Sequence, residues 1–123
     1  MNSVALPDMT TAGLVKRFED VCLSQDVAIL NDDNEEFTRL FREMVAIEDE
    51  LRSRDGDERR ALAALFEHRN AQVRLNAAKA TLALLPQEAR RVIEALAHSH
   101  EFPQAGYAGM TLVSLERGIF KPT

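Results

Sequence analysis

Histidines and a nearby acid are the residues most suited to metal binding or acid-base chemistry. Glu94 and His98 are four residues apart, so on a helix their side chains would share one face. His98 and His100 are two apart and would point about 200° away from each other, so they could not chelate one ion from one face. No third ligand stands near Glu94 and His98. The spacing therefore predicts a solvated side-chain pair and no metal site.

Two acidic clusters contain the carboxylates that calcium prefers. The first consists of Asp32, Asp33, Glu35 and Glu36, and the second lies within residues 55–58. Neither has the calcium-loop spacing with a central Gly and a distal Glu. Both stand just ahead of apolar-periodic stretches, where acids stabilise the positive end of a helix dipole. We therefore predict helix starts and no cofactor, and we take the first cluster as a candidate partner-binding surface.

The remaining nucleophile candidates lack an activating partner. Cys22 is the single cysteine, and it falls on the apolar side of an expected helix, which is typical of a small core residue. No phosphate-binding glycine loop and no Ser nucleophile motif occurs. The sequence therefore favours a protein without catalytic residues. A small hydrolase that uses Glu94 and His98 is a less favoured alternative.

Charge is distributed unevenly along the chain. The net charge is −5, yet residues 1–54 carry 12 acids and 6 bases, whereas residues 55–123 carry 8 acids and 9 bases. Nucleic-acid binding needs a concentrated positive face, so overall acidity disfavours it. A nucleic-acid-associated helical-repeat protein nevertheless stays an alternative, because basic residues are numerous in the later helices. They are Arg59, Arg60, Arg69, Arg74, Lys79, Arg90 and Arg91.

The segment 70–86 predicts a helix with apolar residues on two opposite faces. One face holds Val73, Ala77, Ala80 and Leu84, and the other holds Leu75, Ala78, Leu82 and Leu85. A helix of this kind needs a neighbour on each side, so we expect it between two helical layers, as in repeat arrays.

Five further helices follow from apolar periodicity and capping signals. The first runs from Thr10 or Thr11 to Leu30, and Gly13 and the polar residues 24–26 weaken it. The others are expected at 34–54, at 58–68, from Pro86 to a turn at 99–103, and at 103–117. The expected cap of the second helix is Asn34, and Gly118 ends the last helix.

The start of the last expected helix is unusually rich in small residues. Gly106 and Gly109 suggest close helix packing as the simpler interpretation. Tyr107 and Met110 project roughly opposite the apolar stripe of this helix. They are either covered by the terminal residues 119–122 or form an exposed adhesive patch. Both are therefore candidate partner-binding residues.

Two stretches carry a family resemblance, HRNAQVRLNAAKATL at residues 68–82 and PQAGYAGMTL at residues 103–112. The first resembles a HEAT-type repeat unit, in which an apolar residue and an Arg, here Val73 and Arg74, stand near the start of the inner helix. Together the two stretches resemble a small bacterial family of HEAT-like domains of unknown function. The resemblance covers most of residues 37–122. It implies a compact all-helical fold, with no activity and no functional residues to transfer.

The expected fold is all-α, with about six helices in three antiparallel pairs that form a HEAT-like right-handed α-α superhelix or a compact bundle. Residues 1–9 are expected to be a lead-in segment and residues 10–123 a single HEAT-like domain. No apolar run approaches the length of a membrane span, and the N-terminus lacks the pattern of a signal peptide. We therefore expect a cytoplasmic protein.

The expected function is that of a non-catalytic protein-protein interaction module. Three helix pairs give a small surface, which suits one protein partner or a homo-oligomer. The acidic first half suggests the sharper hypothesis that the partner is a basic bacterial protein that this domain binds and neutralises.

Overall fold

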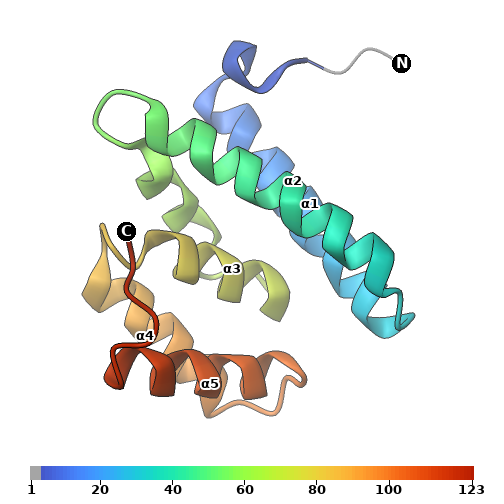
Figure 1. Cartoon of the computed structure of the whole chain (residues 1–123), viewed down its shortest axis with the longest axis vertical. Helices are drawn as coiled ribbons and strands as arrows, with labels where there is room; N and C mark the ends of the chain where they lie inside the picture. Colours follow the sequence, from blue (N-terminus) through green and yellow to red (C-terminus); the bar gives the residue numbers. More distant parts are fainter. Residues whose placement is uncertain (1–3) are drawn as a thin grey trace. The chain divides into compact units, whose positions relative to one another are not determined.

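The computed structural model describes residues 4–123, so the first three residues of the expected lead-in lie outside the described residues. The described chain consists of five α-helices and two 3₁₀ helices, and it contains no strand (Figure 1). The expected all-α class is confirmed. Two compact units divide the chain, one up to Ala61 and one from Leu62 to Thr123. No helix among residues 4–123 is long and apolar enough to cross a membrane.

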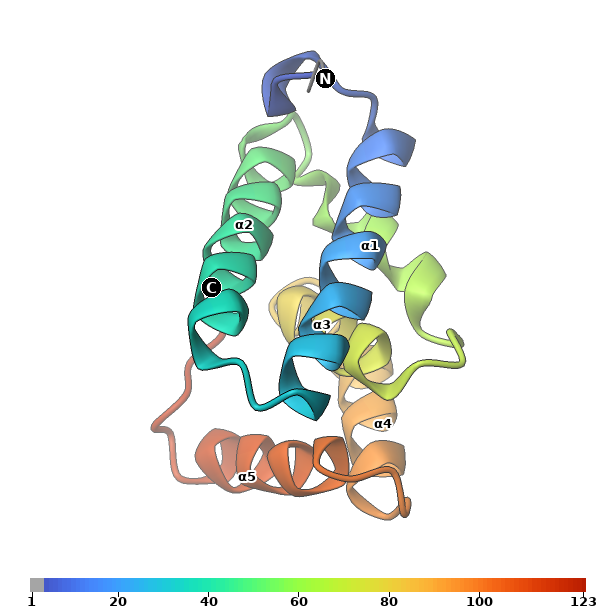
Figure 2. The same cartoon turned by 90° about the vertical axis from the view of Figure 1, so that its right-hand side faces the viewer.

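The first unit is built on two long helices, α1 (Thr11–Leu30) and α2 (Asn34–Ser53), which lie side by side (Figure 2). The Thr10 hydroxyl caps α1 by accepting a hydrogen bond from the Gly13 N–H at 3.0 Å. The Asp33 carboxylate caps α2 by accepting from the Glu36 N–H at 3.1 Å. The cap of α2 is thus one residue earlier than the sequence suggested. Helix α1 is continuous through both of its weak points.

The buried side chains of α1 and α2 recur every three or four residues, as the apolar stripes require. The apolar ones are Leu14, Phe18, Val21, Cys22 and Ala28 of α1, and Leu40, Met44, Ile47 and Leu51 of α2. Gln25 is fully buried among them, and its Nε2 donates to the Met44 sulfur at 3.6 Å. The polar end of this side chain is therefore not left without a partner.

Arg54, just after α2, holds the start of the chain in place. Its guanidinium donates to the Leu6 carbonyl at 3.2 Å and to the Met9 carbonyl at 2.7 Å. Leu6 is the first residue of the short 3₁₀ helix η1 (Leu6–Asp8), and Met9 directly follows it. Its Nε also donates to the Glu50 carboxylate at 3.0 Å. The expected lead-in is therefore anchored over residues 6–9.

The helix expected at 58–68 is a 3₁₀ helix, η2 (Glu58–Leu65). Gly56 and Asp57 before it have left-handed backbones, with φ of 77° and 53°. Such a short segment gains few hydrogen bonds against the cost of starting an α-helix, which favours the tighter form. After η2, the His68 N–H still donates to the Leu65 carbonyl three residues earlier, at 3.1 Å.

The second unit contains α3 (Ala71–Thr81), α4 (Pro86–Ala97) and α5 (Gln104–Glu116), and α4 packs against both others. Its core consists of eight buried apolar residues. They are Ala71, Leu75, Ala78, Leu82, Ala89, Ile93, Leu96 and Ala108. This unit places one face of α5 inside and leaves the other face outside.

Helix α3 begins where expected and ends early. The Asn70 side chain caps it by accepting from the N–H groups of Gln72 and Val73, at 2.9 and 3.2 Å. The helix ends at Thr81, whose carbonyl accepts from both Leu84 and Leu85. Pro86 accounts for the non-helical backbone of Leu85, which has φ of −129° and ψ of 61°. The helix itself ends earlier, at Thr81.

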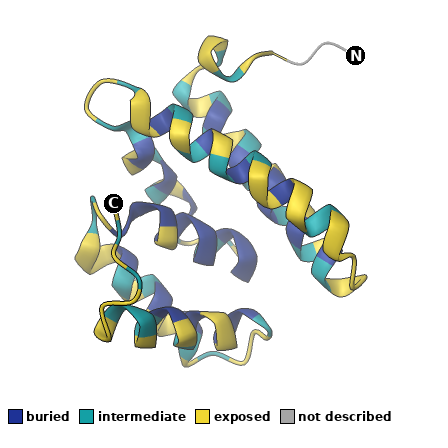
Figure 3. Cartoon of the chain, viewed as in Figure 1, coloured by how far each residue is buried: buried dark blue, intermediate teal, exposed yellow. Residues whose placement is uncertain are grey.

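Nearly all of α3 is buried, as the dark blue of this helix in Figure 3 shows. Leu75 and Leu82 belong to the core of the second unit, and Val73 and Ala77 on the opposite face are also fully buried. Within α3 the apolar residues of both predicted faces are therefore buried, whereas Leu84 and Leu85, which follow the helix, are half-buried. The position of α3 between two helical layers stays a prediction. The pairing of helices into HEAT-like repeats, and the single domain over 10–123, stay predictions.

Candidate binding surfaces

Two of the four carboxylates in the acidic cluster at the α1–α2 turn accept hydrogen bonds within the chain, and the other two face solvent. Asp33 is committed to the cap of α2, and Glu36 receives two hydrogen bonds from Arg39, at 2.7 and 2.9 Å. The Arg39 guanidinium lowers the pKa of the Glu36 carboxyl. Asp32 and Glu35 are exposed, and neither forms an ion pair with any residue in the described part of the chain. Two of the four predicted acidic residues are therefore available to a partner.

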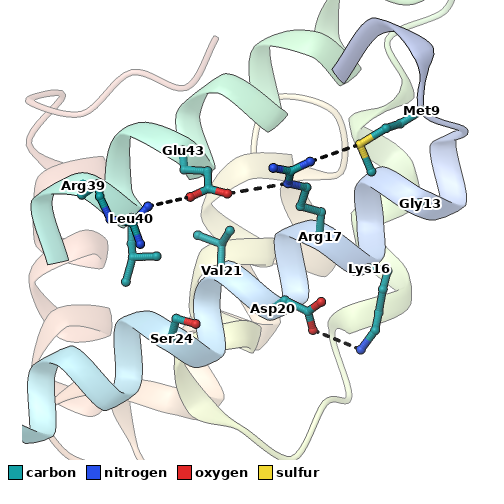
Figure 4. A pocket seen from close by; sticks show the side chains of 10 residues that line it. All are labelled: Met9, Gly13, Lys16, Arg17, Asp20, Val21, Ser24, Arg39, Leu40 and Glu43. Carbon is teal, nitrogen blue, oxygen red and sulfur yellow. Dashed lines mark hydrogen bonds and ion pairs between the residues drawn. The ribbon is translucent and has the colours of Figure 1, made fainter. Parts of the chain in front are cut away.

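A groove of about 520 Å³ runs between α1 and α2 (Figure 4). Its rim carries three cationic side chains, and each has an acidic neighbour. The Lys16 ammonium lies 3.1 Å from the Asp20 carboxylate, which raises the pKa of Lys16. Glu43 lies between the two arginines, with its oxygens 3.6 Å from Arg17 and 3.4 Å from Arg39. Glu43 thus connects the two helices.

The charges of this groove compensate one another. Val21 and Leu40 contribute apolar side chains to its lining. Three acids, Asp20, Glu43 and the nearby Glu36, offset the charges of the three cations. The groove therefore shows no excess positive charge for an anionic ligand, and its ion pairs serve to join α1 to α2. Sequence spacing did not reveal it, because Arg17 and Glu43 are on different helices. Only the register of the two helices brings them together.

A smaller hollow of about 330 Å³ lies in the second unit. Its lining combines apolar residues, among them Phe66 and Val92, with two arginines, Arg74 and Arg91. The Arg74 guanidinium donates to the His68 carbonyl at 2.7 Å and pairs with the Glu101 carboxylate. Arg74 therefore connects the start of α3 to the loop before α5, which is a structural use of its charge.

Two of the three histidines, His68 and His98, have side chains engaged in local hydrogen bonds. The His98 Nδ1 lies 2.8 Å from the backbone carbonyl of Glu94, while the Glu94 carboxylate lies 3.4 Å from Arg90. The His68 Nδ1 accepts from the Asn70 N–H at 3.0 Å. Within residues 4–123, no three His, Cys, Asp or Glu side chains come together as metal ligands would. Cys22 is fully buried.

Three of the basic residues counted toward a nucleic-acid surface have acidic partners. Arg59 is almost fully buried and forms two short hydrogen bonds to Asp57, Arg74 pairs with Glu101, and Arg90 contacts both Glu94 and Glu116. Asp57 and Arg59 shift each other in opposite directions: the pKa of the carboxyl is lowered and the pKa of the guanidinium is raised. The positive charge that could face a phosphate backbone is correspondingly reduced.

The outer face of α5 is exposed and lacks charge. No charged residue occurs between Glu101 and Glu116, so α5 is uncharged up to its last residue, Glu116. Tyr107 is 46% exposed and Met110 is 67% exposed, and Ile119, which could have covered them, is itself 74% exposed. The exposed side of α5 is visible in yellow in Figure 3. Of the two alternatives for Tyr107 and Met110, the structure has the exposed one.

The glycines of α5 have no packing partner within the described chain. A Cβ atom added at Gly106 or at Gly109 would meet nothing within 4 Å. Close packing inside the chain, the simpler interpretation of these residues, is therefore wrong. We define the outer α5 face as Gly106, Tyr107, Gly109, Met110 and Val113, which together give an open, uncharged surface.

Comparisons with known proteins give a family and a fold relative. The family described as a domain of unknown function (DUF2019) matches residues 12–116. The crystal structure of the protein RPA1889 from Rhodopseudomonas palustris CGA009 is similar, with 51% sequence identity and a TM-score of 0.93 over 98% of this chain and 100% of that chain. None of the curated proteins matches.

Proposed function

Since this chain belongs to the DUF2019 family of domains of unknown function, we propose from its surfaces that it is a non-catalytic protein-binding module that uses the outer α5 face. The observation that carries the proposal is an exposed helix face without charge. Solvated helix faces of globular proteins carry polar and charged residues, whereas contiguous exposed apolar surface marks interaction sites.

The composition of the outer α5 face suits a protein partner. Tyr107 and Met110 offer large side chains of the kinds enriched at protein interfaces. Phe102, in the loop before α5, is 69% exposed and is a second exposed aromatic residue near the start of this helix. Aromatic residues anchor protein interfaces because they bury a large area with few rotatable bonds.

A basic partner is a finer part of the proposal. It rests on Asp32 and Glu35, the exposed carboxylates at the α1–α2 turn that have no ion pair within residues 4–123. Such rim charges steer association and make its rate depend on salt. A HEAT-like arrangement of the helices is likewise proposed, on the strength of a largely buried α3.

Site-specific photocrosslinking in the native host tests the α5 proposal. A photoreactive residue in place of Tyr107 should give a discrete crosslinked protein product. The same residue in place of Leu30, which is 77% exposed at the end of α1, is the matched control and should not give that product. Equal products at both positions, or none at position 107, would count against the outer α5 face as a binding surface.

A further inference from the structure

Along the outer α5 face, two small residues are followed by two large ones. At about 100° per residue, Gly106, Gly109, Met110 and Val113 lie within about 100° of one another on the helix. The order along the helix is therefore small, small, large, large. A Cβ at either glycine would meet no atom of residues 4–123 within 4 Å, so both are open to an approaching molecule.

This order is complementary to itself when reversed. If two α5 helices cross antiparallel about the midpoint of Gly109 and Met110, Met110 of one copy lies over Gly109 of the other. Val113 then lies over Gly106 of the other copy, and the reverse contacts are identical. A two-fold interface has this property, since residue i contacts j while j contacts i. Glycine at both sites allows the two backbones to approach closely.

The charges at the ends of α5 match the same arrangement. Glu101, which pairs with Arg74, precedes the helix, whereas Glu116, Arg117 and Lys121 stand at its C-terminal end and together carry a net charge of +1. An antiparallel crossing brings the acidic end of one helix toward the basic end of the other. Arg117 then also lies near Phe102 of the second copy, where a guanidinium can stack on the exposed ring. Parallel pairing would instead bring like charges together.

We propose that the partner bound by the outer α5 face is a second copy of this chain, in an antiparallel two-fold dimer. This inference rests on the proposed function and specifies its partner. The dimer covers Met110 and Val113, which account for much of the exposed apolar surface of α5. Opposed helix dipoles add a favourable electrostatic contribution.

Sedimentation analysis over a range of concentrations tests the dimer. The wild-type protein should change from monomer to dimer as its concentration rises. M110E places a carboxylate at the centre of the interface and should raise the dimer dissociation constant at least about tenfold. L30E makes the same change at another exposed apolar site and should leave the dissociation constant unchanged.

A second variant separates loss of pairing from loss of folding. G109Q fills the open space with a bulky, uncharged side chain, and glutamine favours helix more than glycine does. The diluted variant should therefore unfold at the same temperature as the wild type or higher, yet dimerise at least about tenfold more weakly. A dimer that persists in both M110E and G109Q would overturn the proposal.

Cysteine crosslinking tests the register. G106C and V113C proteins, when mixed and oxidised, should form a mixed disulfide faster than either protein alone forms its own disulfide. The native Cys22 is buried and provides the unreacted reference. Equal rates in the mixed and separate samples would rule out this antiparallel register.

The outcomes also distinguish this inference from the proposed function. A wild-type protein that is monomeric at every concentration overturns the dimer. If position 107 in that case still crosslinks to a different protein, the outer α5 face remains a binding surface. A crosslinked product with twice the mass of the chain instead supports both.

Discussion

Arg59 illustrates how one buried charge is satisfied at the residue scale. Its Nε and a terminal nitrogen donate to the two oxygens of Asp57, at 2.9 and 2.7 Å. The same carboxylate accepts from the Arg59 N–H at 3.3 Å. Asp57 therefore supports both the charge and the backbone at the start of η2. Its left-handed φ suits Asp or Asn better than most other residues.

We predict that D57N destabilises the protein by about 2 kcal/mol at neutral pH, because Asn retains the backbone preference but leaves the Arg59 charge without its carboxylate. The lowered pKa of Asp57 gives stability that is full above the unfolded-state pKa of about 3.9 and is lost as the pH falls through the folded-state value. Urea unfolding of wild type and D57N should show a difference in the free energy of unfolding that becomes smaller at acidic pH.

The neighbouring D55N variant is the control for this prediction. Asp55 is exposed and forms no ion pair in the described chain, so D55N should change stability by less than about 0.5 kcal/mol. A difference between wild type and D57N that stays constant below the ordinary Asp pKa would show that the effect is not the loss of the carboxylate charge.

At the scale of elements, capping chemistry was the most predictable part of the fold. Thr10, Asn70 and Pro86 mark helix starts as expected, because a cap depends on residues within one turn. The boundary errors are also local: Asp33 caps α2 in place of Asn34, and α3 ends at Thr81 rather than near Pro86. At the start of α2, two neighbouring residues could serve as the cap, whereas α3 ends ahead of Pro86 with no competing residue.

The contacts between elements could not be predicted in the same way. Glu50 and Arg54 are four residues apart in sequence, and this local spacing suits the ion pair that they form at the end of α2. The further contacts of Arg54, to the Leu6 and Met9 carbonyls, depend on where the chain start lies after folding. In the candidate site, the sequence alone identifies the glycines of α5 as unusual for a helix. That they face open space is visible only once the helices of the second unit are packed.

We predict that R54A frees residues 6–9 from the end of α2, because it removes the donors to both carbonyls together with the pairing to Glu50. Hydrogen exchange of the Met9 amide, which bonds to the Leu6 carbonyl, should become faster, and stability should fall by about 1–2 kcal/mol. R42A, on the exposed side of α2, is the control and should leave this amide protected. Unchanged exchange in R54A would contradict the anchoring role.

At the scale of the whole molecule, charge and apolar surface are assigned to different units. The acidic excess lies within residues 1–54, whereas the outer α5 face belongs to the second unit. Composition revealed the charge asymmetry. It did not show that the carboxylates of Asp33 and Glu36 already accept hydrogen bonds within the chain. For this reason the proposed function rests mainly on α5 and less on the acidic turn.

If two copies pair through α5, the unfolding temperature of the protein depends on its concentration, because a dimer binds only folded chains. Each tenfold rise in concentration should raise the Tm of the wild type by about 2–4 °C. M110E should show a weaker dependence that begins only at higher concentration, because its dimer dissociates more readily. L30E should follow the wild type, since Leu30 lies outside the outer α5 face. Scanning calorimetry over a hundredfold concentration range, about two such steps, measures all three proteins. A wild-type Tm that does not change with concentration would mean that folding is not coupled to pairing.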